Sequence, residues 1–241
     1  MVGFLSAGIL FSFSAKAPFI FAVFFIAAVI LLLLRQPLIS EIRDEPARKV
    51  FLETEKDRPE SARRFLYIAW CANFVSWFIV GTVRNLFPKL GTELGFSSTA
   101  IGFFVFLIIL AQTAMFFILG RTYRWHYKLF PIIFFQTFAV LALILLALTS
   151  NIFYFMISMI FLGLSSGVTY FSSIFYSLYG FIDKGKRSGI HEAFLGAGTF
   201  CGPLAGGLAA YKFGIRAPYL TAALLLAVAI TTELMIYRRK R

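Results

Sequence analysis

The sequence predicts an all-α fold, a polytopic bundle of seven transmembrane helices. Its composition is the first reason: of 241 residues, 60% are hydrophobic, 18% aromatic and only 14% charged, whereas soluble domains carry roughly a quarter charged residues. The second reason is that apolar runs long enough to cross about 30 Å of hydrocarbon recur along the chain. The third is that Lys and Arg gather in alternate connecting segments, as they do in cytoplasmic loops.

The spans divide the chain into three parts. Residues 1–35 contain one span, at 17–34. Residues 36–65 form a charged cytoplasmic linker, in which we expect a short amphipathic helix around Ala47 to Glu55. Residues 66–241 should form a six-helix transmembrane bundle. Its spans are expected at 66–87, 99–120, 130–149, 152–179, 190–211 and 217–237.

The span at 190–211 is rich in glycine. Gly and Pro weaken helices in water, but in lipid the backbone has no other hydrogen-bond partners, so the helix forms and its glycines become contact surface. Gly198, Gly202 and Gly206 are four residues apart, a spacing that lets a neighbouring helix approach closely. Pro203 should kink the helix, and Gly207 ends the run. We expect a tightly packed helix where two bundles could meet.

This glycine run also carries a resemblance. The pattern G-x-x-x-G-P-x-x-G-G, from Gly198 to Gly207, resembles the glycine–proline motif of the major facilitator superfamily, which lies on the fifth helix with a weaker counterpart on the eleventh. A basic-Ala-Pro-aromatic tetrad, Arg216 to Tyr219, also occurs 200 residues earlier as Lys16 to Phe19. Repeated halves are a known transporter design. The resemblance implies that the seven spans are the sixth to twelfth helices of a twelve-helix transporter, so that most of the first half is missing.

The net charge of +12 follows the two sides of the membrane. If the linker and the C-terminus share one side, that side carries 18 of the 23 Lys and Arg residues, and the opposite side carries the other five. By the positive-inside rule the first side is cytoplasmic. We therefore expect a multi-pass protein of the plasma (inner) membrane with a cytoplasmic C-terminus. We expect the lipid bilayer to be the partner of its basic residues, and no nucleic acid is needed to explain the charge.

No residue pattern indicates an enzyme, a cofactor or a metal site. Cys71 and Cys201 both lie in apolar spans, so we expect free thiols. The sequence HEAFL at His191 lacks the second His of the zinc pattern H-E-x-x-H. No acidic residue lies deep in a span, where a membrane enzyme would need one. Glu233, one turn before the basic tail, is expected at the membrane interface.

Polar residues along the span at 66–87 are candidates for a solute cavity. Asn73, Trp77 and Arg84 share one helical face. Arg84 lies near the outer edge of the hydrocarbon core, which leaves two interpretations open. It either extends to the outer headgroups or places a charge at the extracellular mouth of the cavity.

A second polar face lies on the span at 152–179. Ser166, Tyr170 and Ser173 recur there at helical spacing. Such residues either serve helix packing or line a wet cavity. The resemblance implies that the spans beginning near 66, 99, 152 and 190 face the cavity, which adds Gln112 to the candidates.

His191 and Glu192 open the glycine-rich helix at its cytoplasmic end. The helix dipole stabilises a Glu in the first turn without any further role. Alternatively, the two residues form a protonatable pair that gates the inner mouth, since His titrates near neutral pH. The loop from Gly120 to Lys128 lies where the superfamily has a basic motif but lacks its Asp. We therefore expect this loop to anchor the protein at the cytoplasmic surface rather than to gate.

These features favour a secondary transporter that moves a small solute by alternating access, with or without a proton. The resemblance implies a further partner, the missing N-terminal half, as a separate or upstream segment. The alternative is a self-sufficient seven-helix receptor or sensor. A retinal protein would need a lysine in its last span, and residues 217–237 contain none. A receptor would also leave the repeated tetrad unexplained.

Overall fold

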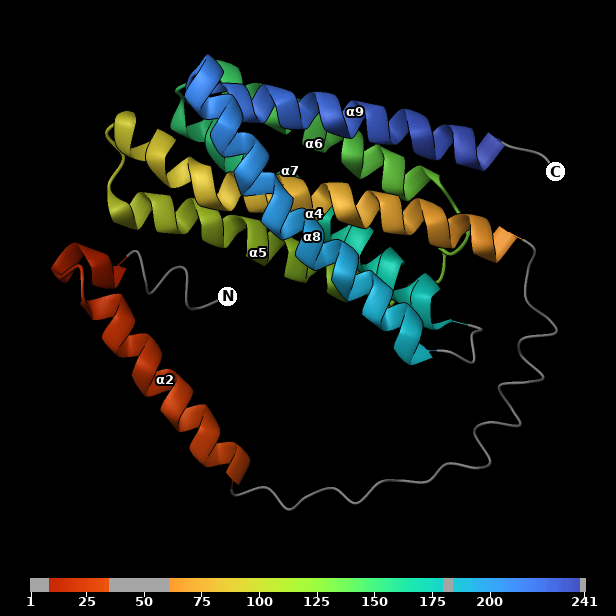
Figure 1. Ribbon diagram of the computed structural model, residues 1–241, viewed down its shortest axis with the longest axis horizontal. Helices are drawn as coiled ribbons and strands as arrows, with labels where there is room; N and C mark the ends of the chain where they lie inside the picture. The colour runs from red at the N-terminus through yellow and green to blue at the C-terminus, as the bar shows by residue number, and fades with distance from the viewer. Residues whose placement is uncertain (1–8, 35–60, 180–183, 239–241) are drawn as a thin grey trace.

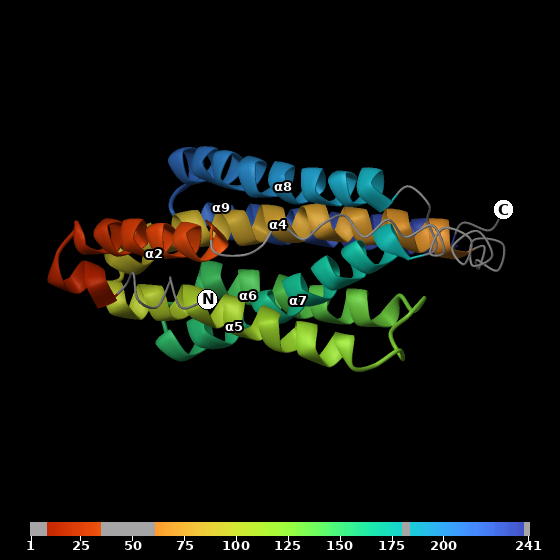
Figure 2. The same cartoon turned by 90° about the horizontal axis from the view of Figure 1, so that it is seen from below.

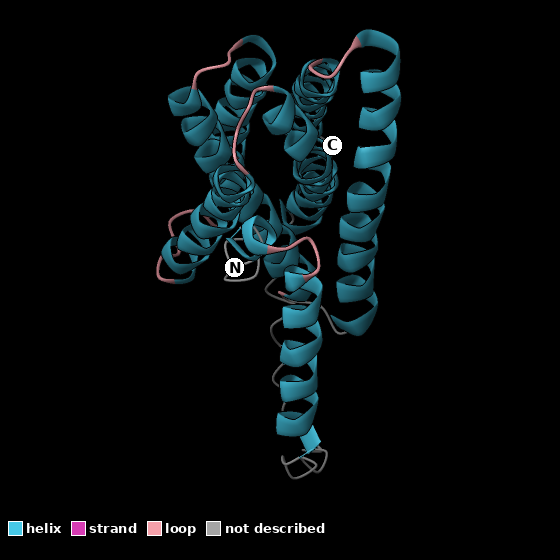
Figure 3. Ribbon diagram, turned by 90° about the vertical axis from the view of Figure 1, so that its left-hand side faces the viewer, coloured by secondary structure: helices cyan, strands magenta, loops and turns pink. Residues whose placement is uncertain are grey.

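The structure, a computed structural model, describes residues 9–34, 61–179 and 184–238, and its secondary structure there consists of helices joined by short loops. The helix expected around Ala47 to Glu55 and most of the linker lie outside these residues. The helices are α2 (Ala17–Leu34), α4 (Ser61–Glu93), α5 (Ser98–Gly120), α6 (Phe130–Leu148), α7 (Ile152–Leu178), α8 (Lys184–Phe213) and α9 (Ala217–Arg238). Figure 3 shows them joined by loops, with no strand in the described part. The predicted all-α fold is confirmed.

The helices α4 to α9 form one bundle, and each is long and apolar enough to cross a membrane. The two central helices are α4, which packs against α5, α7, α8 and α9, and α7, which packs against α4, α5, α6 and α8. The helices α6 and α9 pack against each other on one flank (Figure 1). Figure 2 shows α8 along one face, above α4 and α9. A polar face at the centre of such a bundle is shielded from lipid on most sides.

The contact between α8 and α4 is made through glycine. A Cβ on Gly198 would lie 2.5 Å from the carbonyl oxygen of Phe74, and a Cβ on Gly202 would overlap the carbonyl oxygen of Phe78. A Cβ on Gly206 would lie 2.8 Å from side-chain atoms of Leu86 and Thr82. At Gly198 and Gly202 the two backbones are therefore in direct contact, and at Gly206 side chains of α4 come close, as the four-residue spacing implies.

Gly207 and Pro203, the other two residues of the glycine motif, differ from the three glycines that face α4. A Cβ on Gly207 would meet no atom within 4 Å, so this glycine is not part of the contact. Pro203 lies inside α8, which continues through it from Lys184 to Phe213. Across the interface, a Cβ on Gly81 would lie 2.9 Å from the carbonyl oxygen of Thr199, the carbonyl four residues before Pro203. A proline removes the hydrogen bond to that carbonyl, which faces α4 here.

The repeated tetrad begins two helices in the same way. In α9, the amide of Ala217 donates to the carbonyl of Gly214 (3.0 Å) and the amide of Tyr219 to that of Arg216 (3.2 Å). In α2, the bonds 200 residues earlier are the same: Ala17 to Ser14 (3.1 Å) and Phe19 to Lys16 (3.2 Å). The sequence repeat is therefore also a repeat of local structure.

The two helices differ in their surroundings. Tyr219 is fully buried, and α9 packs against α4, α6 and α8. In α2, every side chain from Phe19 to Leu32 is exposed, and Figure 1 shows α2 standing apart from the bundle.

Candidate functional site

A buried histidine joins three helices toward one end of the bundle. His191, on α8, is 0% exposed, although it lies only two turns from the start of its helix. Its Nδ1 accepts a hydrogen bond from the hydroxyl of Ser173 on α7 (2.8 Å) and faces the amide nitrogen of Asn73 on α4 at 3.5 Å. Because an amide nitrogen can only donate, we assign Nδ1 as the acceptor of both contacts, which corresponds to the tautomer with the imidazole proton on Nε2. We call Asn73, Ser173 and His191 the histidine centre.

Hydroxyl groups hold the histidine centre in place. Ser177 lies one turn after Ser173, so both hydroxyls are on the same face of α7. The hydroxyl of Ser177 donates to the carbonyl of Ser173 (2.7 Å) and accepts a hydrogen bond from the indole of Trp70 on α4 (2.9 Å). These bonds fix α7 against α4 beside the histidine.

An aromatic wall borders the histidine centre. The ring of Tyr170 lies 4.9 Å from that of His191, nearly perpendicular to it. Trp77 on α4 lies 6.1 Å from Tyr170, and Phe116 on α5 lies 5.4 Å from it. Tyr170, Trp77 and Phe116 are half-buried. Aromatic rings around a few polar atoms are typical of a small-molecule site.

Three polar atoms of this region are buried without a hydrogen-bond partner: Oδ1 of Asn73, Nε1 of Trp77 and Nε2 of His191. Nε2 of His191 lies 3.8 Å from a carboxylate oxygen of Glu192, too far for a hydrogen bond. An unsatisfied buried polar group costs about 1–3 kcal/mol. Together they supply one acceptor and two donors that a polar molecule could use.

The other candidates from the sequence do not belong to the histidine centre. Arg84 is three turns after Asn73 on α4, about 16 Å along the helix axis, and is half-buried. Gln112 on α5 is also half-buried. Ser166 is fully buried and donates to the carbonyl of Gly163 in its own helix (2.9 Å). Glu192 is exposed beside the histidine.

The sequence analysis missed a second buried polar pair. Glu233 on α9 was expected at the membrane interface, but its side chain is 0% exposed. It accepts a hydrogen bond from the amide of Gln136 on α6 (2.9 Å). The expectation of an interfacial glutamate was therefore wrong. One available signal was Gln136 itself, a lone amide in an otherwise apolar span.

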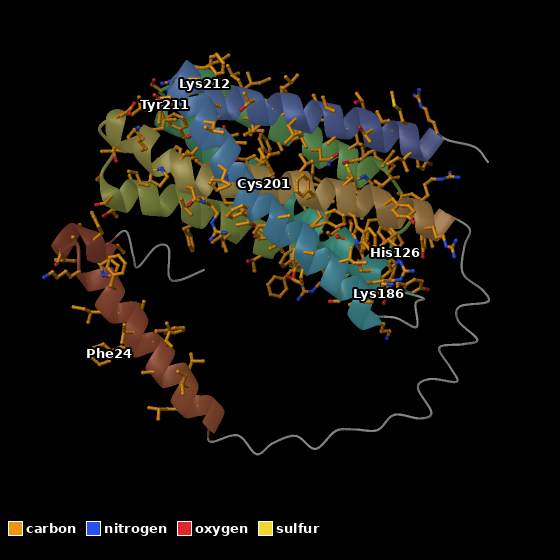
Figure 4. The ribbon with its side chains drawn as sticks, in the orientation of Figure 1. Phe24, His126, Lys186, Cys201, Tyr211 and Lys212 are labelled. Carbon is orange, nitrogen blue, oxygen red and sulfur yellow. The ribbon has the colours of Figure 1, made fainter. Side chains whose placement is uncertain are left out.

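The loop between α5 and α6 is fixed to the end of α7. The amide of Tyr127, which has a φ of 54°, donates to the hydroxyl of Tyr176 (2.8 Å), and the indole of Trp125 donates to the carbonyl of Leu119 (3.0 Å). The ring of His126 stacks on Phe175 at 4.3 Å, and burial lowers the pKa of His126. Figure 4 shows His126 and Lys186 at the same end of the bundle, opposite Tyr211 and Lys212.

The fold and this site define a class: a polytopic helical membrane protein with a polar centre between its inner helices. The model of the Major Facilitator Superfamily matches the chain in two overlapping segments, residues 1–184 and 69–241. The chain belongs to this superfamily of membrane transporters. A search of curated proteins finds no match to it. The resemblance noted in the glycine motif is thus confirmed, and the superfamily is one of membrane transporters.

Proposed function

We propose that this protein transports a small polar solute by alternating access and that the histidine centre contacts the solute. The observation that carries the proposal is the set of three unsatisfied buried atoms on Asn73, Trp77 and His191. A solute with at least one donor and one acceptor would satisfy them and recover the cost of leaving them unpaired. The solute would lie against the rings of Trp77 and Tyr170.

Each residue of the region has a proposed role. Asn73 accepts a hydrogen bond from the solute, and Trp77 and His191 donate to it. Ser173 is a positioning residue, because its bond to Nδ1 keeps the proton of His191 on Nε2. Glu192 follows His191 on α8, is exposed, and can take up a proton at the inner mouth. Arg84 and Gln112 would act farther along the solute's path.

Alternating access requires a second bundle that closes the cavity at each end in turn. The helices α4 to α9 supply one wall, so we propose that a second six-helix bundle, the counterpart of the first half, faces them. In this proposal α2 is the last of the six helices of that second bundle. This arrangement follows the parallel repeats of the transporter design.

We propose that the basic end of the bundle faces the cytoplasm, as the positive-inside rule requires. The C-terminus would then be cytoplasmic, in the plasma membrane. Basic residues at this end come from the starts of α4 and α8, the α5–α6 loop and the end of α9. They are Arg63, Arg64, Arg121, Arg124, Lys128, Lys184, Lys186, Arg187 and Arg238.

A thermal-shift experiment on the purified chain tests the solute site. Neutral, anionic and cationic solutes are screened for a rise in the melting temperature; a ligand at 100 times its dissociation constant stabilises by about 2.7 kcal/mol. Trp77→Phe keeps the ring but removes the N–H, and Asn73→Leu removes the acceptor. We expect both to abolish the shift that a hit produces. Thr231→Ala, exposed on α9, should keep it. A shift that survives both site variants would place the solute elsewhere.

A further inference from the structure

The buried pair of Gln136 and Glu233 lies outside the proposed solute site. It joins α6 to α9 on the flank of the bundle, and both side chains are at most 1% exposed. One hydrogen bond links them, from Nε2 of Gln136 to Oε1 of Glu233. The two remaining oxygens, Oε1 of Gln136 and Oε2 of Glu233, are buried and have no hydrogen-bond partner.

The surroundings of this pair are apolar. Residues one turn away on both helices belong to the two hydrophobic cores: Ile132 and Ala139 on α6, and Ala229 on α9. Within the described residues no Lys, Arg or His pairs with Glu233. The titratable group that faces it from α4 is the thiol of Cys71, and Arg64, also on α4, instead donates to the carbonyl of Tyr237 (3.2 Å). The helix α8 adds no charged group to this surrounding.

A count of donors and acceptors distinguishes the two states of the carboxyl group. An ionised Glu233 can only accept, so two oxygens stay unpaired and a charge is buried without a counter-ion, which is strongly unfavourable. A neutral carboxylic acid has one O–H donor. Because an acid and a primary amide can pair face to face, that O–H on Oε2 can donate to Oε1 of Gln136. One proton therefore removes both unpaired oxygens and the charge.

A metal ion would not achieve the same result. Hard cations such as calcium take about six to eight oxygen ligands, whereas two unpaired oxygens are present here. The described residues also contain no group of three His, Cys, Asp or Glu side chains that could hold a metal.

We propose that Glu233 is a proton-binding site, occupied at neutral pH, in which the neutral acid and Gln136 form a cyclic hydrogen-bonded pair. The proton holds α6 and α9 together and allows both to pack against the core. Its release would leave a buried carboxylate, so the packing of α9 against α4 and α6 depends on the bound proton. This site is separate from the histidine centre and does not require it to bind a solute.

Infrared spectroscopy of the purified full chain in detergent tests the proposal. We expect the C=O stretch of a neutral carboxylic acid at pH 7, and we expect Glu233→Gln to abolish it. The matched control is Glu192→Gln, which removes an exposed acid and should leave the band intact. A spectrum without a neutral acid band, or one in which the band survives Glu233→Gln, would overturn the proposal.

The pH dependence of the melting temperature gives an independent measurement. An unfolded Glu has a pKa of about 4.3, so at neutral pH the folded chain binds a proton that the unfolded chain has released. Stability from this group is complete below about pH 4.3 and is lost as the pH rises until the folded site releases its proton. Glu233→Gln, whose amide can form the same cyclic pair, should match the wild type near pH 4, lack this loss as the pH rises, and therefore melt at a higher temperature than the wild type at pH 7. A variant that melts at a lower temperature than the wild type near pH 4, or whose melting temperature declines with pH as that of the wild type does, would overturn the proposal.

Discussion

The helices α2 and α9 begin with the same backbone hydrogen bonds and then have different surroundings. Both follow a short turn, and both place Ala and Pro in their first two positions, where a proline costs no helical hydrogen bond. In α9, however, Arg216 donates to the carbonyls of Ala147 and Thr149 at the end of α6. In α2 the corresponding Lys16 is exposed.

The difference shows that the tetrad determines where a helix starts but not what it packs against. The buried face of α9 consists largely of Tyr219, Ala222, Ala223, Leu226 and Ala229, small and large side chains that interlock with neighbours. The residues of α2 at the same offset are apolar as well, but all are exposed.

The largest expected effect is at the aromatic residue of the tetrad. Tyr219→Ala would leave a cavity beneath α9, and we expect a loss of about 3–5 kcal/mol in the free energy of unfolding, as for other large aromatic residues. Phe19→Ala is the matched control at 72% exposure and should leave the bundle unchanged. Thermal melting in detergent measures both. An equal loss for Phe19→Ala would show that α2 packs as α9 does and would break the comparison.

A smaller effect is expected at the basic residue. Arg216→Ala removes hydrogen bonds to the carbonyls of Ala147 and Thr149 and to the hydroxyl of Ser150. Hydrogen bonds to charged groups are worth about 1.5–3 kcal/mol, and we expect a loss in that range. Lys16→Ala should change the melting temperature of the bundle little. If Arg216→Ala leaves the melting temperature unchanged, the hydrogen bonds of Arg216 to the end of α6 do not stabilise the bundle.

The smallest effect is expected at the turn before the tetrad, where the two copies differ. Gly214 has a φ of +94°, whereas Ser14 does not have a positive φ. A Cβ on Gly214 would meet no atom within 4 Å. Gly214→Ala therefore measures only the cost of a positive φ at a residue with a Cβ, which we expect to be about 1 kcal/mol in the free energy of unfolding. Gly185→Ala is the control, since its site is equally open and its φ is not positive. Equal melting temperatures for the two variants would mean that the turn relaxes.

Much of the fold follows from the sequence, because helix position depends on local composition. The span expected at 152–179 is α7, Ile152–Leu178, and that expected at 217–237 is α9, Ala217–Arg238. The largest differences are at α4 and α8, which extend to Ser61 and Lys184. Their ends are polar residues that a search for apolar runs excludes.

The sites are less predictable because they join residues far apart in the chain. Asn73, Ser173 and His191 were each candidates, yet periodicity places a residue only on a face of its own helix. Their convergence depends on how α4, α7 and α8 cross. The pairing of Gln136 with Glu233 spans 97 residues, and depth along a helix alone wrongly placed the glutamate at the interface.

The glycine contact between α8 and α4 restricts how these helices can move. Packed helices usually adjust by small shear movements, in which side chains change their contacts as the helices slide. At Gly198 and Gly202, however, the backbone of α8 lies on the backbone of α4 with no side chain between them. Sliding by part of a turn would move Gly202 away from the carbonyl of Phe78, and a shift of about one turn, roughly 5.4 Å, is needed before Gly198 or Gly206 takes its place. We therefore expect α4 and α8 to move together as one unit rather than to adjust by small shear movements.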